Sequence, residues 1–246
     1  MTDVATGAPL IERGETHAAY ERYAHWKQWT GPFTFTPGDA RYFRVETRGA
    51  AIRDADVLEI GFGSGAFLAW ASSLGARVSG TEIIPSLVEE ARRRDVTLLA
   101  PDFETVAHRL ACRFDTIVAF DVFEHFTFDD VTARLDAAHA MLRPGGHLIL
   151  RFPNGQSPFG LTKQHGDPTH LSVLSLGKLE PAIARRDWQV VRYRGQAIIV
   201  EGGVKRRAVR LLRSALRGLV SLTIRFVYAA PHPMDAVVVL VLRKGA

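Results

Sequence analysis

Cysteine is almost absent from this sequence, which has one, Cys112, in 246 residues. A disulfide framework and a structural zinc site built on thiolates are therefore excluded, and a reducing compartment is expected. The N-terminus has no basic start followed by an apolar stretch, so it does not predict a secretory signal. No uninterrupted apolar run reaches the ~18 residues that a spanning helix needs. We therefore expect a cytoplasmic protein.

Acidic residues are missing from one long segment. Residues 202–234 hold seven Lys and Arg residues and no Asp or Glu, whereas the formal net charge of the whole chain is only +5. The positive charge thus belongs to this segment and not to the surface in general, which argues against a nucleic-acid partner.

On a helical wheel, residues 204–228 place apolar side chains on one half and arginines on the other. This pattern predicts a long basic amphipathic helix. Such a helix is typical of peripheral association with an anionic membrane at the inner face. Packing on its own domain or on a second subunit fits the pattern equally well, and the oligomeric state cannot be derived from it.

The central part of the chain alternates short β-rich runs with amphipathic helices. The expected strands are 56–60, 76–81, 96–100, 114–120, 147–152, 188–193 and 236–243. Expected helices lie between them at 64–74, 85–94, 103–110, 129–142 and 174–186. This alternation predicts an α/β fold, a Rossmann-like seven-stranded and mostly parallel sheet with helices on both faces and an antiparallel last strand. A ligand would bind beyond the carboxyl ends of its strands.

A glycine-rich turn follows the first expected strand in the run VLEIGFGSGAFL. Gly61, Gly63 and Gly65 allow positive φ angles and a close approach of a ligand to the main chain. The spacing Gly61-x-Gly63-x-x-Ala66 also fits the fingerprint of NAD-type dehydrogenases. Glu59 would repel a pyrophosphate, yet it suits the ammonium group of an amino-acid-bearing cofactor.

Four ordered blocks, VLEIGFGSGAFL, GTEIIPSLVEEA, FDTIVAFDVFEHF and MLRPGGHLILRFPN, resemble the class I S-adenosylmethionine (SAM)-dependent methyltransferases. The resemblance implies SAM as cofactor, with the glycine loop on its methionine part. It implies that Glu82 binds the ribose hydroxyls, that Ile83 stacks on adenine, and that Asp102 with Phe103 meets the adenine edge. A carboxylate suits two vicinal hydroxyl donors. Asp102 also fits a helix N-cap.

The fourth expected strand ends in Asp121 and Val122, which complete the predicted cofactor site, and then in a Glu-His pair. This pair resembles the branch that includes quinone-biosynthesis O-methyltransferases, and His125 is a candidate general base. Structural hydrogen bonding by the histidine is an equal alternative. Asp121, Glu124 and His125 could hold a divalent metal, but we expect none.

A polar loop after the fifth expected strand offers His165 and His170 as further base candidates, with Asp167 able to orient an imidazole. Aromatic residues near the N-terminus are expected to form another wall of the acceptor site. They are Tyr20, Tyr23, Trp26, Trp29, Phe33 and Phe35.

The sequence thus predicts an N-terminal helical cap (1–50) and a SAM-binding methyltransferase domain (51–246) that carries the basic amphipathic insertion (202–234) before its last strand. The expected reaction is histidine-assisted methyl transfer to an oxygen, less so a nitrogen, of a small molecule or a sugar or glycan precursor. The resemblance to polysaccharide-cluster methyltransferases favours a glycan acceptor near a membrane. A catalytically silent adaptor at a membrane surface and an NAD-type dehydrogenase remain as alternatives.

Overall fold

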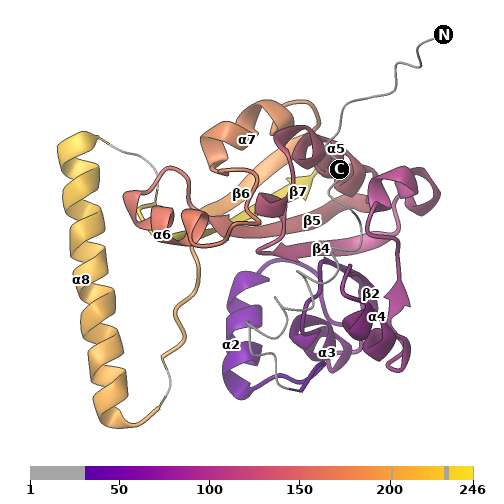
Figure 1. The fold of residues 1–246 in the computed structure, drawn as a ribbon, viewed down its shortest axis with the longest axis horizontal. Helices are drawn as coiled ribbons and strands as arrows, with labels where there is room; N and C mark the ends of the chain where they lie inside the picture. The colour runs from indigo at the N-terminus through magenta and orange to yellow at the C-terminus, as the bar shows by residue number, and fades with distance from the viewer. Residues whose placement is uncertain (1–30, 201, 230–232, 246) are drawn as a thin grey trace.

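Seven strands form one sheet in the order β3-β2-β1-β4-β5-β7-β6 in the computed structural model (Figure 1). The structure describes residues 31–200, 202–229 and 233–245. The strands are β1 (Asp56–Ile60), β2 (Arg77–Thr81), β3 (Thr97–Leu98), β4 (Phe114–Phe120), β5 (Leu142–Pro153), β6 (Trp188–Gly195) and β7 (Val237–Lys244). Neighbouring strands are parallel except where β7 pairs with β5 and β6. The predicted mostly parallel sheet with an antiparallel last strand is confirmed.

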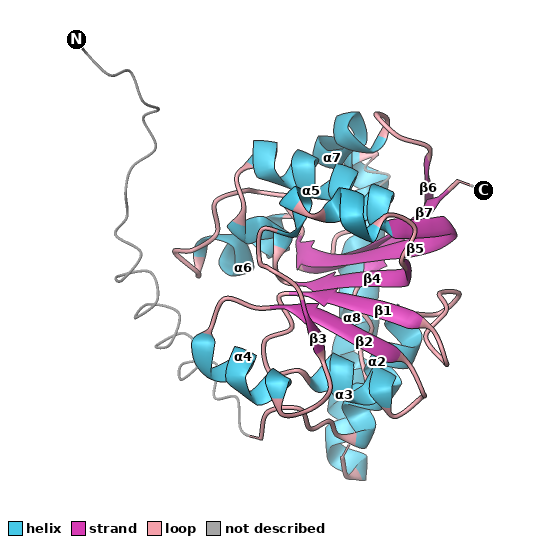
Figure 2. Cartoon of the chain, turned by 90° about the vertical axis from the view of Figure 1, so that its right-hand side faces the viewer, coloured by secondary structure: helices cyan, strands magenta, loops and turns pink. Residues whose placement is uncertain are grey.

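Helices cover both faces of this sheet (Figure 2). On one face lie α2 (Pro37–Glu46), α3 (Ala66–Ser72) and α4 (Pro85–Arg92), and on the other α5 (Phe128–Met141) and α7 (Leu176–Ile183). Successive strand residues alternate between the two apolar layers, so that Ile117 packs in the layer of α5 and Val118 in that of α3. Burial on both faces explains why the parallel strands read as nearly continuous apolar runs.

Two expected elements differ in the structure, and a third lies outside the described residues. Strand β3 is only two residues long, at the edge of the sheet. The helix expected over 103–110 is instead two 3₁₀ turns, η1 (Phe103–Thr105) and η2 (Ala107–Leu110), because Val106 between them has φ −110° and ψ 1°, outside the α region. The cap helix predicted before residue 30 lies outside the described residues, as do Tyr20, Tyr23, Trp26 and Trp29.

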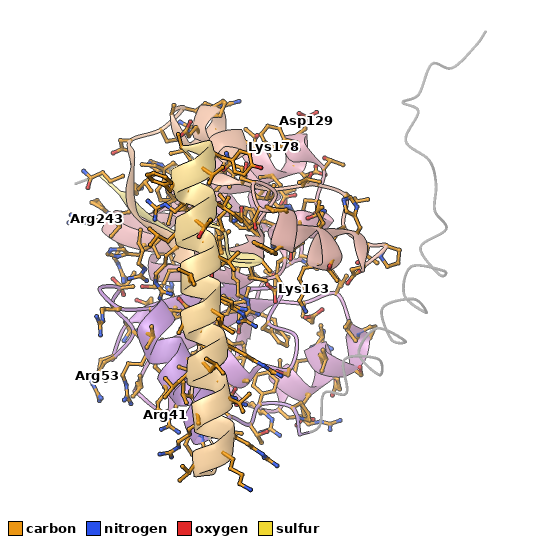
Figure 3. All side chains as sticks on the ribbon, turned by 90° about the vertical axis from the view of Figure 1, so that its left-hand side faces the viewer. Arg41, Arg53, Asp129, Lys163, Lys178 and Arg243 are labelled. Atoms are coloured by element: carbon orange, nitrogen blue, oxygen red, sulfur yellow. The ribbon has the colours of Figure 1, made fainter. Side chains whose placement is uncertain are left out.

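The insertion between β6 and β7 forms α8 (Val204–Tyr228), a helix of 25 residues without a buried side chain. It stands beside the domain at the left of Figure 1 and runs across the body in Figure 3. The predicted bounds of this amphipathic helix are confirmed. None of the described helices combines the length and the apolar character needed to cross a bilayer.

Candidate functional site

The glycine loop after β1 depends on glycine for two separate reasons. Gly61 has φ 63°, and a Cβ added there would come within 2.8 Å of the Val122 side chain. Gly65 has φ 70° at the start of α3, and its added Cβ would meet the ring of Phe33 at 2.6 Å. Both positions therefore exclude larger residues by backbone conformation and by contact. The loop turns tightly beneath the carboxyl edge of the sheet.

The carboxylate of Glu82, just after β2, is held by backbone amides. Oε2 accepts a hydrogen bond from the N–H of Gly63 at 2.8 Å, and Oε1 accepts from Ile83 and Ile84 at 2.7 and 3.0 Å. Burial raises the pKa of Glu82, while the three amide donors oppose this shift. The side chain thus ties the glycine loop to the end of β2 in a fixed orientation.

A pocket of about 630 Å³ opens at this edge. Its lining includes predicted cofactor-site and base residues, namely Glu59, Gly61, Gly63, Glu82, Ile83, Asp102, Asp121, Val122 and His125. Asp39 and Phe43 of α2 close it on one side, so the helix before the sheet contributes to the site. A cavity of this size is ordinary for a small ligand or cofactor.

Glu59 is a buried acid with an unsatisfied oxygen. Its side chain is 4% exposed, and its Oε2 has no hydrogen-bond partner among the described residues. Burial raises its pKa well above the usual value, nearby Arg151 opposes this, and Glu82 adds to it. A donor or cationic group of a ligand in the pocket would satisfy this oxygen and favour the ionised form.

Two of the predicted cofactor residues do not line the pocket. The ring of Phe103 is fully buried in the core and does not line the pocket, because η1 turns it inward against α5. Gly65 is likewise absent from the lining and packs on Phe33. Arg134 and Phe126 line the pocket on this side, with the guanidinium 3.9 Å from the ring centroid. Asp102 stands at the N-cap position of η1, but its side chain makes no capping hydrogen bond.

An ion pair that the sequence does not predict lies in the pocket lining. Arg151 of β5 makes a bidentate pair with Asp121, at 2.8 and 2.5 Å, and donates to the hydroxyl of Tyr42 at 2.7 Å. Burial lowers the pKa of Arg151, but the attraction of Asp121 and Tyr42 outweighs it and raises the pKa overall. A charged residue inside the apolar run LILRFP was the available signal. The carboxylate of Asp121 is therefore bound by arginine. The backbone of Asp121 has a φ of 57°.

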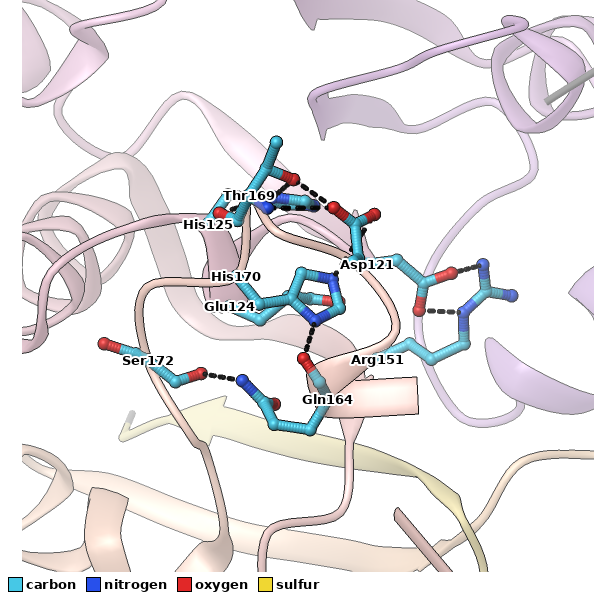
Figure 4. Close-up of polar contacts among 9 residues, drawn as sticks. Asp121, Glu124, His125, Arg151, Gln164, Thr169, His170 and Ser172 are labelled. Carbon is cyan, nitrogen blue, oxygen red and sulfur yellow. Dashed lines mark hydrogen bonds and ion pairs between the residues drawn. The ribbon is translucent and has the colours of Figure 1, made fainter. Parts of the chain in front are cut away.

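A second polar group, which we call the histidine cluster, consists of Glu124, His125, Asp167, Thr169 and His170. Figure 4 labels four of these residues, Glu124, His125, Thr169 and His170. His125 ends the 3₁₀ turn η3 (Phe123–His125), and its Nδ1 lies 2.9 Å from the hydroxyl and 3.2 Å from the carbonyl of Thr169. The Thr169 hydroxyl donates to Asp167 Oδ1 at 2.5 Å. Burial and the neighbouring His170 lower the pKa of His125. A neutral imidazole with Nδ1 as donor satisfies this network.

The three candidate histidines differ in their position relative to the pocket. The rings of His125 and His170 meet edge to face, with centroids 4.8 Å apart, but only His125 lines the pocket. His170 Nδ1 contacts the carbonyl of Gln164 at 3.0 Å, and its Nε2 lies 4.0 Å from Glu124. His165 is exposed at the end of α6 (Leu161–His165), away from the pocket lining. His125 is thus the candidate base that the geometry favours.

The grouping of possible metal ligands differs from the predicted one. Ligand atoms of Glu124, His125 and His170 lie within 4.8 Å of one another, whereas Asp121 is paired with Arg151. Glu124 is almost fully buried, and burial together with nearby Asp121 raises its pKa well above the usual value. A protonated Glu124 suits hydrogen bonding in the cluster, and an ionised one would suit a cation.

Comparison with known sequences places this site in a family. Residues 20–193 match the sequence model of a family described as a methyltransferase domain. A curated relative, ubiquinone biosynthesis O-methyltransferase of Xanthomonas euvesicatoria, is 32% identical over 112 residues, which are 43% of this chain. The same enzyme of Xanthomonas axonopodis is 32% identical over 113 residues. These matches span only 46% and 44% of the relatives' own lengths.

Solved structures share the fold over nearly the whole chain. A SAM-dependent methyltransferase from Archaeoglobus fulgidus aligns over 95% of both chains, with a TM-score of 0.55 and 18% identity. The N-methyltransferase NodS of Bradyrhizobium japonicum, solved with S-adenosylhomocysteine, covers 94% of this chain and 99% of its own, with a TM-score of 0.58 and 16% identity. At such identities the likeness concerns the fold.

Proposed function

Since the chain belongs to the family of methyltransferase domains, we propose that it transfers a methyl group from SAM to an oxygen of a small-molecule or sugar acceptor. The observation that carries this proposal is the pairing of two acids, the buried Glu59 and the half-buried Glu82, around the glycine loop in one pocket. The curated relatives are O-methyltransferases, which supports an oxygen acceptor.

The residues present fit SAM. The unsatisfied Oε2 of Glu59 suits the ammonium group, and Glu82, fixed by three amides, is placed to accept from the ribose hydroxyls. Ile83, which is 41% exposed, offers an apolar surface for adenine, and Asp102 lies beside it in the lining. When bound, SAM supplies a methyl group already activated on a sulfonium, so the protein chiefly aligns the acceptor and takes its proton.

His125 takes that proton in our proposal. The contact of its Nδ1 with Thr169 assigns the donor role to that nitrogen, so Nε2 is the atom that accepts a proton from the acceptor hydroxyl. Its lowered pKa keeps the imidazole neutral near pH 7, which is the form a base needs. Asp167 orients the Thr169 hydroxyl and, through it, the ring.

Parallel calorimetric titrations of the purified chain with SAM, S-adenosylhomocysteine and NAD test the proposal. Micromolar binding of the two sulfur nucleosides without binding of NAD supports it, and an acceptor screen with phenols and sugars would follow. Binding of NAD alone would replace it with the dehydrogenase. Binding of none of the three compounds would favour the catalytically silent adaptor, in which the fold no longer serves catalysis.

A further inference from the structure

Helix α8 exposes an apolar surface that no described part of the chain covers. Along its 25 residues no side chain is buried, and Val204, Leu222 and Phe226 are 85%, 66% and 88% exposed. The other exposed apolar residues are Val209, Leu211, Leu212, Leu216, Leu219, Val220, Val227 and Tyr228. Scattered surface leucines are ordinary, but a continuous stripe of this length marks an interaction surface.

The apolar stripe is turned away from the domain. At about 100° per residue, Ser214, Ser221 and Ile224 lie opposite the stripe, and they are the half-buried residues of the described helix. On that same side Arg210 donates to the carbonyl of Ile199 in the segment that leads into α8, at 3.0 Å. The partly covered residues of α8 thus lie opposite the stripe, and the stripe itself is not covered by the described residues. Packing on its own domain, one of the two predicted roles, does not occur in this structure.

Both ends of the insertion emerge beside the pocket. Gly195, where β6 ends, pairs with Val238 at the start of β7, at the edge of the sheet where β1 and β4 also end. The next residue, Gln196, contacts the Tyr42 hydroxyl at 3.5 Å, and Tyr42 receives a hydrogen bond from Arg151 in the pocket lining. Both ends of the insertion therefore leave the domain at this edge of the sheet, and Figure 1 shows α8 at the left of the molecule.

We propose that α8 docks the protein on an anionic lipid bilayer, with the apolar stripe inserted at the headgroup boundary and the arginines beside the lipid phosphates. Charge complementarity carries the choice of partner, because α8 has seven basic residues and no acid. A second copy of α8 would bring an equal positive charge against the first, which disfavours a helix pair. A nucleic acid would neutralise the arginines but would leave the apolar stripe in water. The inference does not depend on the proposed methyl transfer.

Vesicle flotation of the full chain tests this docking. Vesicles of phosphatidylglycerol and phosphatidylcholine should carry the protein upward, vesicles of phosphatidylcholine alone should not, and binding should weaken as salt rises. The double variant Arg213→Glu with Arg217→Glu should lose at least ~10-fold in affinity for the anionic vesicles. The matched control is Arg53→Glu with Arg109→Glu, which makes the same charge change at exposed positions on the opposite sheet edge and should bind normally.

Insertion of the stripe needs a second readout, since charge alone could hold the protein at the surface. The double variant Leu212→Gln with Leu219→Gln leaves the charge of α8 unchanged and should also lose flotation, while circular dichroism checks that the domain is folded. An environment-sensitive fluorophore on Leu219→Cys, in a Cys112→Ser background, should shift to the blue with anionic vesicles, more than one on Arg217→Cys. Equal fluorescence shifts at the two positions would overturn the proposal, as would flotation of the leucine variant. A wild-type dimer that forms without lipid and that the leucine variant does not form would also overturn it.

Discussion

The hydroxyl of Thr169 lies between His125 and Asp167. It is 2.9 Å from the imidazole Nδ1 and donates a hydrogen bond of 2.5 Å to the Asp167 carboxylate. Hydrogen bonds from Thr169 lower the pKa of Asp167 against the opposing effect of burial, so this carboxylate remains ionised and keeps the hydroxyl pointing toward it. The lone pair of the hydroxyl is then directed at His125. This relay fixes one tautomer of the proposed base.

Removing the relay should slow the reaction without weakening cofactor binding. Thr169→Val should lower kcat about 10-fold or more, because the imidazole keeps the Thr169 carbonyl but loses the nearer hydroxyl and its link to Asp167, and His125→Gln should lower it by ~10²–10⁴-fold. Thr169→Ser, which keeps the hydroxyl, is the matched control and should remain near wild type. Steady-state kinetics with calorimetric SAM binding check this. Equal activity of the valine and serine variants would refute the relay.

The pH dependence of kcat/KM should report the same histidine. A general base works only when deprotonated, so activity should fall as the pH drops through the pKa of His125 and stay level above it. Because burial and His170 lower that pKa, the acidic limb should lie below ~6.5, the usual value for histidine. His170→Asn removes the neighbouring imidazole and should move the limb toward higher pH. A limb above the usual value would contradict the assignment of the base.

The succession of strands and helices along the chain, the glycine loop and the position of Glu82 could all be predicted from the sequence because each is a local signal. A positive φ angle and a close contact require glycine at position 61. The acid that follows β2 necessarily comes to the same sheet edge, because β1 and β2 are parallel. The burial of the Phe103 ring could not be predicted, because its orientation depends on whether η1 is α-helical or 3₁₀. Sequence spacing does not carry that information.

The relay could not be predicted because its parts come from two loops far apart in the chain. Thr169 lies 44 residues after His125, and nothing in its neighbourhood marks it except an adjacent histidine. Choosing among the histidines also required the structure, because all three lie in polar loops and only His125 lines the pocket. Tertiary contacts, not local pattern, decide such sites.

Glu82 should be essential for SAM affinity. Glu82→Gln should raise the Kd for SAM about 10-fold or more, because it replaces charge-assisted hydrogen bonds to the ribose by neutral ones and turns an amide group toward backbone donors. Glu89→Gln, at an exposed position of α4, is the matched control and should bind as wild type. Calorimetry measures both values, and circular dichroism checks the fold. Unchanged affinity of the Glu82 variant would remove the ribose assignment.

Glu59 should lower the stability of the ligand-free protein at high pH and strengthen the binding of SAM. Its raised pKa means that the folded, ligand-free protein holds a proton that the unfolded chain releases above ~4.3, so Glu59 makes stability fall as the pH rises from that value toward the folded pKa. Glu59→Gln removes this slope. The ligand-free variant should therefore be at least as stable as wild type at pH 8, with a smaller difference between pH 5 and pH 8, yet it should bind SAM more weakly because the ammonium loses its counter-charge. Urea unfolding at both pH values, with and without SAM, measures this.

Glu82 and Glu124 titrate in the same direction but are present in both proteins, so the comparison isolates Glu59. A variant that is less stable at pH 8 and binds SAM normally would show that Glu59 serves the fold instead of the cofactor.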